Sequence, residues 1–118
     1  FTRRLRRQTI STTSETRPRL PIEEAIFVLG RENVPEGHLI WPRHCPEPFL
    51  TNLSLDQGYR GNCEILHHGK VVFSGLALVK RHQQYGKDLL VILLPDVDLG
   101  ELSPDATVEM NPCALELD

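Results

Sequence analysis

The sequence lacks the short motifs that mark common enzymes and metal proteins. Its three cysteines, Cys45, Cys63 and Cys113, include no Cys-x-x-Cys pair, which favours free thiols in a reducing, cytoplasmic compartment over a zinc ribbon or a disulfide framework. No glycine-rich phosphate loop is present. The longest apolar run, residues 89–94, is far shorter than the ~20 residues that span a bilayer. We therefore expect a noncatalytic protein without a cofactor, at most peripheral to a membrane.

Five histidines still invite a metal interpretation, and the nearest set of donors is Cys63, His67 and His68. On an extended strand, Cys63 and His67 share a face but lie about 13 Å apart at ~3.3 Å per residue. A nucleophile built from Cys45 with His44 or His82 is also disfavoured, because adjacent residues on an extended chain point apart and no local signature surrounds the cysteine. We expect no metal ligands and no catalytic residues.

Charge is unevenly distributed along the chain. Residues 1–19 hold six Arg and one Glu, a net +5, and since the whole chain carries −3, the remainder is near −8. The first 19 residues lack apolar periodicity, and we predict a flexible basic tail there. Nucleic-acid binding is not expected, because the body is acidic and its aromatic residues are not interleaved with basic ones. Since the chain begins at Phe1 rather than Met, we expect a fragment of a longer subunit.

Strand-forming sequence is what the chain has in abundance. Apolar and β-branched runs predict strands at 20–30, 38–41, 62–67, 70–80 and 88–94, and two weaker ones at 106–110 and 114–117. His68-Gly69 and 83–87 predict hairpin turns. The Glu23-Glu24 pair after Pro21 leaves a helical turn open as an alternative for the first element. Four prolines in 31–50 predict an irregular connection.

The pattern therefore predicts a mainly β protein, a small antiparallel β-barrel or saddle. We divide it into the tail 1–19, a β domain at 20–95 and a C-terminal extension at 96–118 with short strands or irregular structure.

Two of the predicted strands are apolar on both sides. Residues 71–79 carry apolar side chains at odd and even positions, and 89–94 is apolar throughout, whereas a strand with one wet face should alternate. No long amphipathic helix is available as a cover. We expect the second sheet to come either from the rest of this chain, closing a barrel, or from another subunit, which makes dimerisation a hypothesis.

The stretch 64–95 resembles the end of the SPOA domain, the β-rich module of flagellar motor switch proteins and of the cytoplasmic ring proteins of type III secretion systems. The family pattern of strand, tight turn, apolar strand with a Gly, second turn and closing apolar strand is matched here by Ile65, Gly69, Gly75, 76–79, Tyr85-Gly86 and 89–92. Leu20-Pro21 and Leu29-Gly30-Arg31 are similar to the start of that module. The similarity covers about residues 20–95, departs from the family in the proline-rich 35–48, and has no counterpart for 96–118.

The resemblance implies an assembly role. SPOA domains pair as intertwined homodimers or heterodimers and build a cytoplasmic ring, near the inner membrane, that docks export-apparatus proteins such as the stator of the secretion ATPase. The expected partners are thus a second copy or a homologous SPOA domain and an export-apparatus protein. Carried over by position, the pairing residues are Ile26, Val28, Val72, Leu76, Leu78, Val91 and Leu93. The alternative is that these residues are the private core of a monomeric barrel.

A second resemblance leads to a different class of function. Arg3 and Arg7 in Arg-x-x-x-Arg spacing, followed by 52–54 and Gly58, are similar to the PilZ domain, a small β-barrel that binds cyclic di-GMP. Guanidinium groups suit phosphates and guanine edges. The family places Gly three residues after the Ser, where this chain has Gln57. The alternative function is therefore a cyclic di-GMP-binding regulatory barrel.

Overall fold

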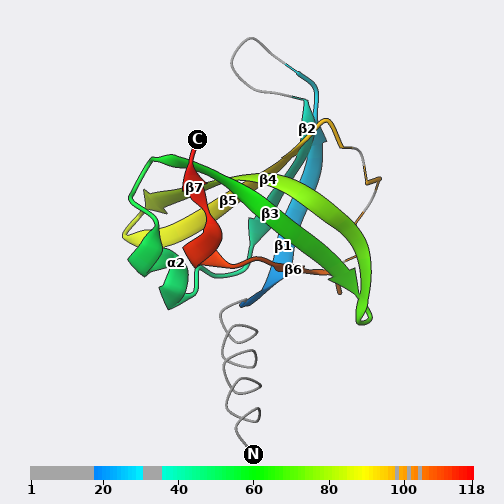
Figure 1. Cartoon of the computed structure of the whole chain (residues 1–118), viewed down its shortest axis with the longest axis horizontal. Helices are drawn as coiled ribbons and strands as arrows, with labels where there is room; N and C mark the ends of the chain where they lie inside the picture. Colours follow the sequence, from blue (N-terminus) through cyan, green and yellow to red (C-terminus); the bar gives the residue numbers. More distant parts are fainter. Residues whose placement is uncertain (1–17, 31–35, 98, 101, 104) are drawn as a thin grey trace, which may run out of the picture.

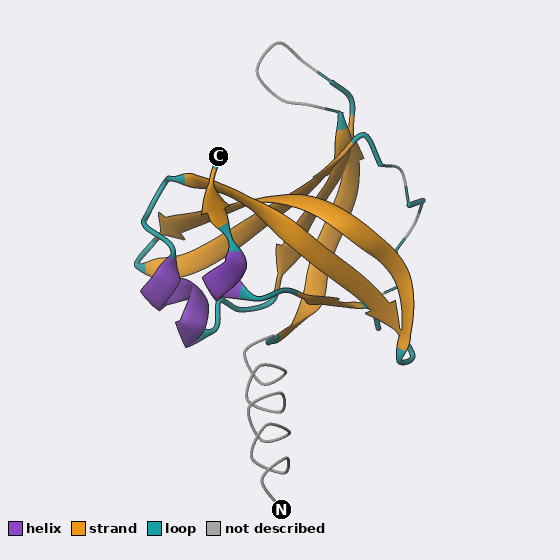
Figure 2. Ribbon diagram, in the orientation of Figure 1, coloured by secondary structure: helices purple, strands orange, loops and turns teal. Residues whose placement is uncertain are grey.

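The computed structural model describes residues 18–30, 36–97, 99–100, 102–103 and 105–118, and it is mainly β with a closed six-strand antiparallel barrel (Figures 1 and 2). The predicted basic tail falls largely on 1–17, outside the described residues. No helix in the described part of the chain is long and apolar enough to cross a membrane. The elements are β1 Arg19–Val28, β2 Gly37–Pro42, α2 Glu47–Asn52, β3 Gly58–His67, β4 Lys70–Gln84, β5 Lys87–Pro95, β6 Thr107–Glu109, the 3₁₀ turn η1 Pro112–Ala114 and β7 Glu116–Leu117.

The barrel closes within one chain. Its strands follow the order β1, β2, β5, β4, β3, β6 and back to β1, because β6 pairs with β1 on one side and with β3 on the other. β6 is only three residues long, and Val108 lies opposite both Leu20 and Ile65. This short strand closes the barrel, and β7 adds two residues to the edge of β3.

Both predicted hairpin turns are present as two-residue connections, and the second is shorter than the predicted 83–87, because β4 runs to Gln84 and β5 begins at Lys87. His68 and Gly69 have φ values of 53° and 78°, and Tyr85 and Gly86 have 53° and 77°. Positive φ at both central residues defines the type I′ turn, whose twist matches that of the flanking strands and for which Gly is the favoured second residue. The turns fix the register of the β3–β4 and β4–β5 ladders.

The core fills the barrel and extends under one end. Alternate residues of the strands point inward, among them Ile40, Ile65, Val79 and Ile92, each at most 1 % exposed. α2 contributes Phe49, which is fully buried, and Figure 2 shows α2 and η1 close together at one end of the barrel. Burial of about 1.5–3 kcal/mol per large apolar side chain is the main stabilising term.

Arg81 connects α2 to the β4–β5 hairpin. Its guanidinium donates to the carbonyl oxygens of Leu50 and Leu53 at the end of α2, at 3.2 and 2.9 Å, and to the Asp88 carboxylate at 2.9 and 3.1 Å. Carbonyls at a helix C-terminus have no partner within the helix, so a cation there satisfies them.

Two features differ from the sequence-based expectation. The proline-rich connection contains α2, because Pro46 precedes the helix at the N-cap position and Pro48 lies in its first turn, where a missing N–H costs nothing. The predicted C-terminal extension supplies the barrel strand β6, and Ala106, Val108 and Met110 belong to the core. Both short C-terminal strands lie within their predicted ranges.

The apolar residues at both parities of 71–79 have two causes. Between Ile65 and Leu66 the β3–β4 register shifts, so that Ile65 faces Phe73 and Leu66 faces Val71, and Val72 is the extra residue of a bulge. Beyond the bulge, Phe73, Ala77 and Val79 pack into or against the core, and Leu76 and Leu78 occupy the opposite face. Closure by the chain itself covers the inner face of these strands.

Candidate docking face on the outside of the barrel

An apolar surface covers the outside of four neighbouring strands, β1, β2, β5 and β4. Side chains of successive strand residues point to opposite sides, and the inner set is fixed by the buried core residues Ile40, Val79 and Ile92. The residues between them therefore face outward. We call this surface the outer face and define it by Ile26, Val28, Leu39, Trp41, Leu76, Leu78, Val91, Leu93 and Pro95.

One cross-strand row forms the middle of the outer face. Ile26 lies opposite Leu39, Leu39 opposite Leu93, and Leu93 opposite Leu78, in three consecutive antiparallel pairings. Leu93 is only 8 % exposed although it is not part of the core cluster, because its two cross-strand neighbours flank it. Ile26, at the end of the row, is 43 % exposed.

The rows on either side extend this surface. Val28, Gly37 and Pro95 are opposite one another on one side, and Leu76, two residues from Leu78 on β4, adds a side chain that is 46 % exposed. Gly37 interrupts the row because a Cβ there would lie 2.1 Å from the Leu94 carbonyl oxygen.

Charged side chains of β1 and β4 lie at the border of the outer face. On the other side of the middle row, Glu24 faces Trp41 and Lys80 faces Val91. Glu24 on β1 and Lys80 on β4 are both exposed and stand on the two outermost strands of the face. An apolar centre with charged groups at its border is the usual composition of a protein–protein contact surface.

The structure brings six of the seven sequence-predicted pairing residues onto the outer face: Ile26, Val28, Leu76, Leu78, Val91 and Leu93. Val72 stands apart at the bulge near the β3–β4 turn. None of the seven belongs to the core cluster, although Leu93 is 8 % exposed. Sequence reasoning missed Leu39, Trp41 and Pro95. The alternation of Leu39 and Trp41 with Ile40 was a signal for the first two, once Ile40 is known to be buried.

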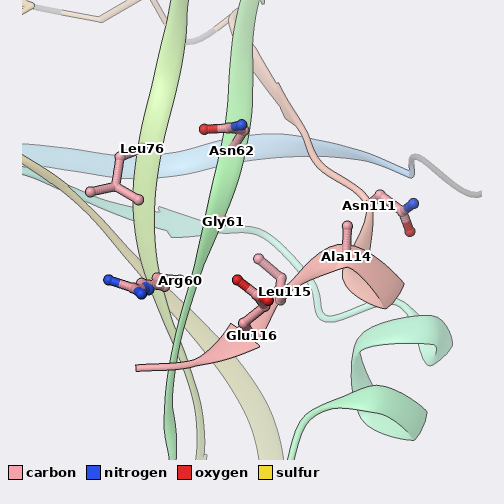
Figure 3. A pocket seen from close by; sticks show the side chains of 8 residues that line it. All are labelled: Arg60, Gly61, Asn62, Leu76, Asn111, Ala114, Leu115 and Glu116. Atoms are coloured by element: carbon pink, nitrogen blue, oxygen red, sulfur yellow. The ribbon is translucent and has the colours of Figure 1, made fainter.

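A groove of about 540 Å³ borders the outer face beyond Leu76. Between the β6 and β7 pairings, Gly61 and Asn62 have no strand partner on that edge among the described residues. Figure 3 shows Leu76 on one side of β3 and residues 114–116 on the other. Gly61 leaves space for the Leu115 side chain, whose Cδ2 would be 2.6 Å from a Cβ. The lining mixes apolar and polar groups, the latter being Arg60, Asn62, Asn111 and Glu116.

The cysteines that sequence reasoning weighed as ligands or nucleophiles are separated. Cys63 points into the core and is 1 % exposed. Burial, followed by the negative charge of Asp88, raises the pKa of Cys45 to about 11 against the opposing effect of Arg81. Cys45 is therefore a protonated thiol at neutral pH, and a thiol is a weak nucleophile.

Tyr59 forms a hydrogen bond with the segment 52–54, which resembles part of the PilZ motif. The Ser54 backbone N–H donates to the Tyr59 hydroxyl at 2.9 Å, and this hydrogen bond lowers the pKa of Tyr59. Asn52 donates its side-chain amide to the Pro48 carbonyl oxygen at 2.7 Å. Arg3 and Arg7, the basic half of that motif, lie outside the described residues.

Comparisons with models of known protein families, with curated proteins and with solved structures find no match to this chain. The function therefore has to be inferred from the barrel and its outer face.

Proposed function

We propose that this chain is a noncatalytic assembly module whose barrel docks onto a second copy of itself through the outer face. The observation that carries the proposal is the apolar row Ile26–Leu39–Leu93–Leu78, which crosses four strands on the side opposite the core. The inner face of the same strands is already covered by barrel closure, so core formation does not account for the outer set. Contiguous exposed apolar surface of this kind marks interaction sites.

The energetic argument rests on partial exposure. Fully burying a large apolar side chain contributes roughly 1.5–3 kcal/mol relative to leaving it in water. Ile26 and Leu76 are exposed by 43 % and 46 %, and Leu39, Trp41, Leu78 and Val91 are half-buried. Each therefore still has a share of that free energy to gain. The free energy gained by burying several such side chains together offsets part of the entropic cost of bringing two chains together.

Charge placement favours a second copy as the occupant. A two-fold axis that runs along the strand direction between β2 and β5 exchanges the β1 side of the face with the β4 side. It places Glu24 of one copy over Lys80 of the other, twice in the dimer, and leaves the apolar rows in the middle. Such a self-complementary patch is what an isologous dimer requires.

At the finer level, we propose that the module is a SPOA-type subunit of a flagellar switch or of a type III secretion cytoplasmic ring. The support is the resemblance over residues 20–95, together with the position of six of its implied pairing residues on one face. In that setting a homologous SPOA domain and an export-apparatus protein, such as the ATPase stator, are the further partners, at the cytoplasmic side of the inner membrane.

Sedimentation or light scattering at micromolar concentration tests the proposal. We expect a dimer for the unmodified chain and a monomer for Ile26→Glu and Leu76→Glu. Val71→Glu is the control, since Val71 is 51 % exposed on the same strand as Leu76 but lies beyond the bulge, near the β3–β4 turn. Glu24→Lys and Lys80→Glu should each weaken the dimer, and the double exchange should restore it. A monomer at all accessible concentrations would refute docking between copies, and co-purification would then identify a homologous partner.

A second candidate function, binding of cyclic di-GMP, is favoured by one observation: a single chain closes a six-strand barrel with residues 52–54 held against it through Tyr59. Isothermal titration with cyclic di-GMP separates the two classes. A heat of binding for the unmodified chain that disappears in the Arg3→Ala, Arg7→Ala double variant would support the nucleotide-binding barrel. For the assembly module we expect no heat of binding with either chain.

A further inference from the structure

Three potential metal ligands converge at the β3–β4 turn. Candidate ligand atoms of His67, His68 and Asp105 all lie within 4.8 Å of one another. They come from two segments 37 positions apart, which meet because β6 pairs with β3. Leu66 lies opposite Thr107, and the antiparallel direction carries Asp105, two residues before Thr107, alongside the turn.

The left-handed backbone at His68 explains how adjacent histidines meet. Two neighbours on an extended strand point to opposite sides, which would keep His67 and His68 apart. His68 has φ 53°, so the strand ends at His67 and the next side chain is redirected. The ring centroids of His67 and His68 are 4.1 Å apart, with the planes inclined by 48°.

Asp105 is held by a turn of its own. Its backbone N–H donates to the Ser103 hydroxyl at 3.2 Å, and the Ala106 N–H donates to the Ser103 carbonyl oxygen at 3.0 Å. Ala106 is buried, which anchors the segment next to the exposed carboxylate. The aspartate thus lies in a turn that the buried Ala106 anchors on its C-terminal side.

We propose that His67, His68 and Asp105 bind a divalent transition metal of the zinc type. Two imidazoles and one carboxylate are donors that suit Zn²⁺. In a tetrahedral site with bonds of ~2.0–2.1 Å the ligand atoms lie about 3.3 Å apart, so the side chains must approach one another by at most about 1.5 Å from their positions here. His68 and Asp105 are exposed and His67 is half-buried, so small side-chain rotations achieve this.

Three protein ligands leave one position of a tetrahedral shell for water or for a donor from outside the chain. A hollow of about 250 Å³ adjoins His67 and is lined further by Val72, Leu99, Leu102, Ser103 and Ala106. Of the three proposed ligands, His67 lines this hollow.

The metal would tie the β3–β4 turn to the segment that leads into β6. β6 holds the barrel closed with only three residues paired on each side, so a cross-link beside it stabilises the closed barrel. Because metal binds the folded arrangement and not the separated segments, binding raises the free energy of unfolding by mass action. This inference is independent of docking through the outer face.

Calorimetric titration of the chelator-treated, dialysed chain with ZnCl₂ tests the site. We expect saturable binding of one Zn²⁺ per chain and a higher Tm with Zn²⁺ than without. His68→Ala and Asp105→Asn should each weaken binding at least about tenfold, because each removes one of three ligands. Neither residue is in the core, so both variants should keep the metal-free Tm.

His82→Ala and Asp56→Asn are the matched controls. His82 and Asp56 form an exposed pair 2.9 Å apart and belong to no three-ligand group among the described residues. These variants should bind Zn²⁺ as the unmodified chain does. Absence of saturable binding would overturn the proposal, and so would binding that is unchanged in both ligand variants or equally weakened in the controls.

Discussion

The two faces of the same four strands are made of the same residue types but differ in what covers them. On the inner face, Ile40, Ile92 and Leu94 are fully buried, because the barrel closes around them. On the outer face, leucine, isoleucine and valine recur with the same spacing, yet Ile26 and Leu76 remain almost half exposed. Burial in this fold is therefore decided by closure through the distant β6, and residue type alone does not separate core from contact surface.

The largest effect that separates the two faces is expected from matched leucine truncations. Leu94→Ala leaves a cavity in the core and should lower the free energy of unfolding by about 2–5 kcal/mol. Leu76→Ala removes a side chain that is 46 % exposed and should cost about 1 kcal/mol or less in the monomer. Urea unfolding measures both.

Protein concentration sharpens this comparison. If a second copy covers Leu76, the cost of Leu76→Ala grows as the concentration rises into the dimer range, whereas the cost of Leu94→Ala stays constant. Equal costs for the two variants in dilute solution would contradict the assignment of inner and outer faces.

A smaller effect is expected from two arginines that differ in burial. Arg81 has a side chain 17 % exposed, pairs with Asp88 and donates to two α2 carbonyls. Arg81→Met leaves these acceptors without their donor, and should cost about 1–3 kcal/mol. Arg19, whose side chain is 74 % exposed in its ion pair with Glu109, is the control, and Arg19→Met should cost below about 1 kcal/mol. Thermal melts at equal ionic strength rank the two, and a larger loss for Arg19→Met than for Arg81→Met would contradict the role assigned to Arg81.

Sequence was sufficient to locate the strands and both hairpin turns. The strands follow from apolar and β-branched runs, and both hairpin turns from glycine at positions of positive φ, features that depend on neighbours in the chain. Non-local pairing was not accessible in this way: nothing near Val108 indicates that it faces both Leu20 and Ile65, so residues 96–118 were read as an extension. α2 was missed because four prolines suggested a break, although Pro46 and Pro48 fall where a helix begins.

For the candidate sites, too, sequence identified individual residues but not their arrangement in space. Six outer-face residues were named from a family resemblance, but their separation from the core depends on which parity each strand turns inward, and that depends on closure. Asp105 was never considered beside His67 and His68, because only the β3–β6 register brings it there. The bulge at Val72 shows the limit of alternation, since one extra residue moves a predicted pairing residue away from the others.

The smallest effect on stability is expected from the cysteines, where a half-buried thiol and an exposed thiol should differ mainly in their rate of alkylation. Cys45 packs against the core, and its pKa of about 11 leaves on the order of 0.1 % thiolate at pH 8. Cys113 is exposed. Alkylation with iodoacetamide, mapped by mass spectrometry, should modify Cys113 first. The rate at Cys45 should rise about tenfold per pH unit up to about pH 11, because only the thiolate reacts.

The raised pKa in the folded state means that the unfolded chain ionises at a lower pH than the folded one. The contribution of Cys45 to the free energy of unfolding is therefore complete below pH 9.0 and is lost as the pH rises towards about 11. Modification of Cys45 as fast as Cys113 at pH 7.5 would show that the end of the barrel beside Asp88 opens readily and that the thiol is not held against the core.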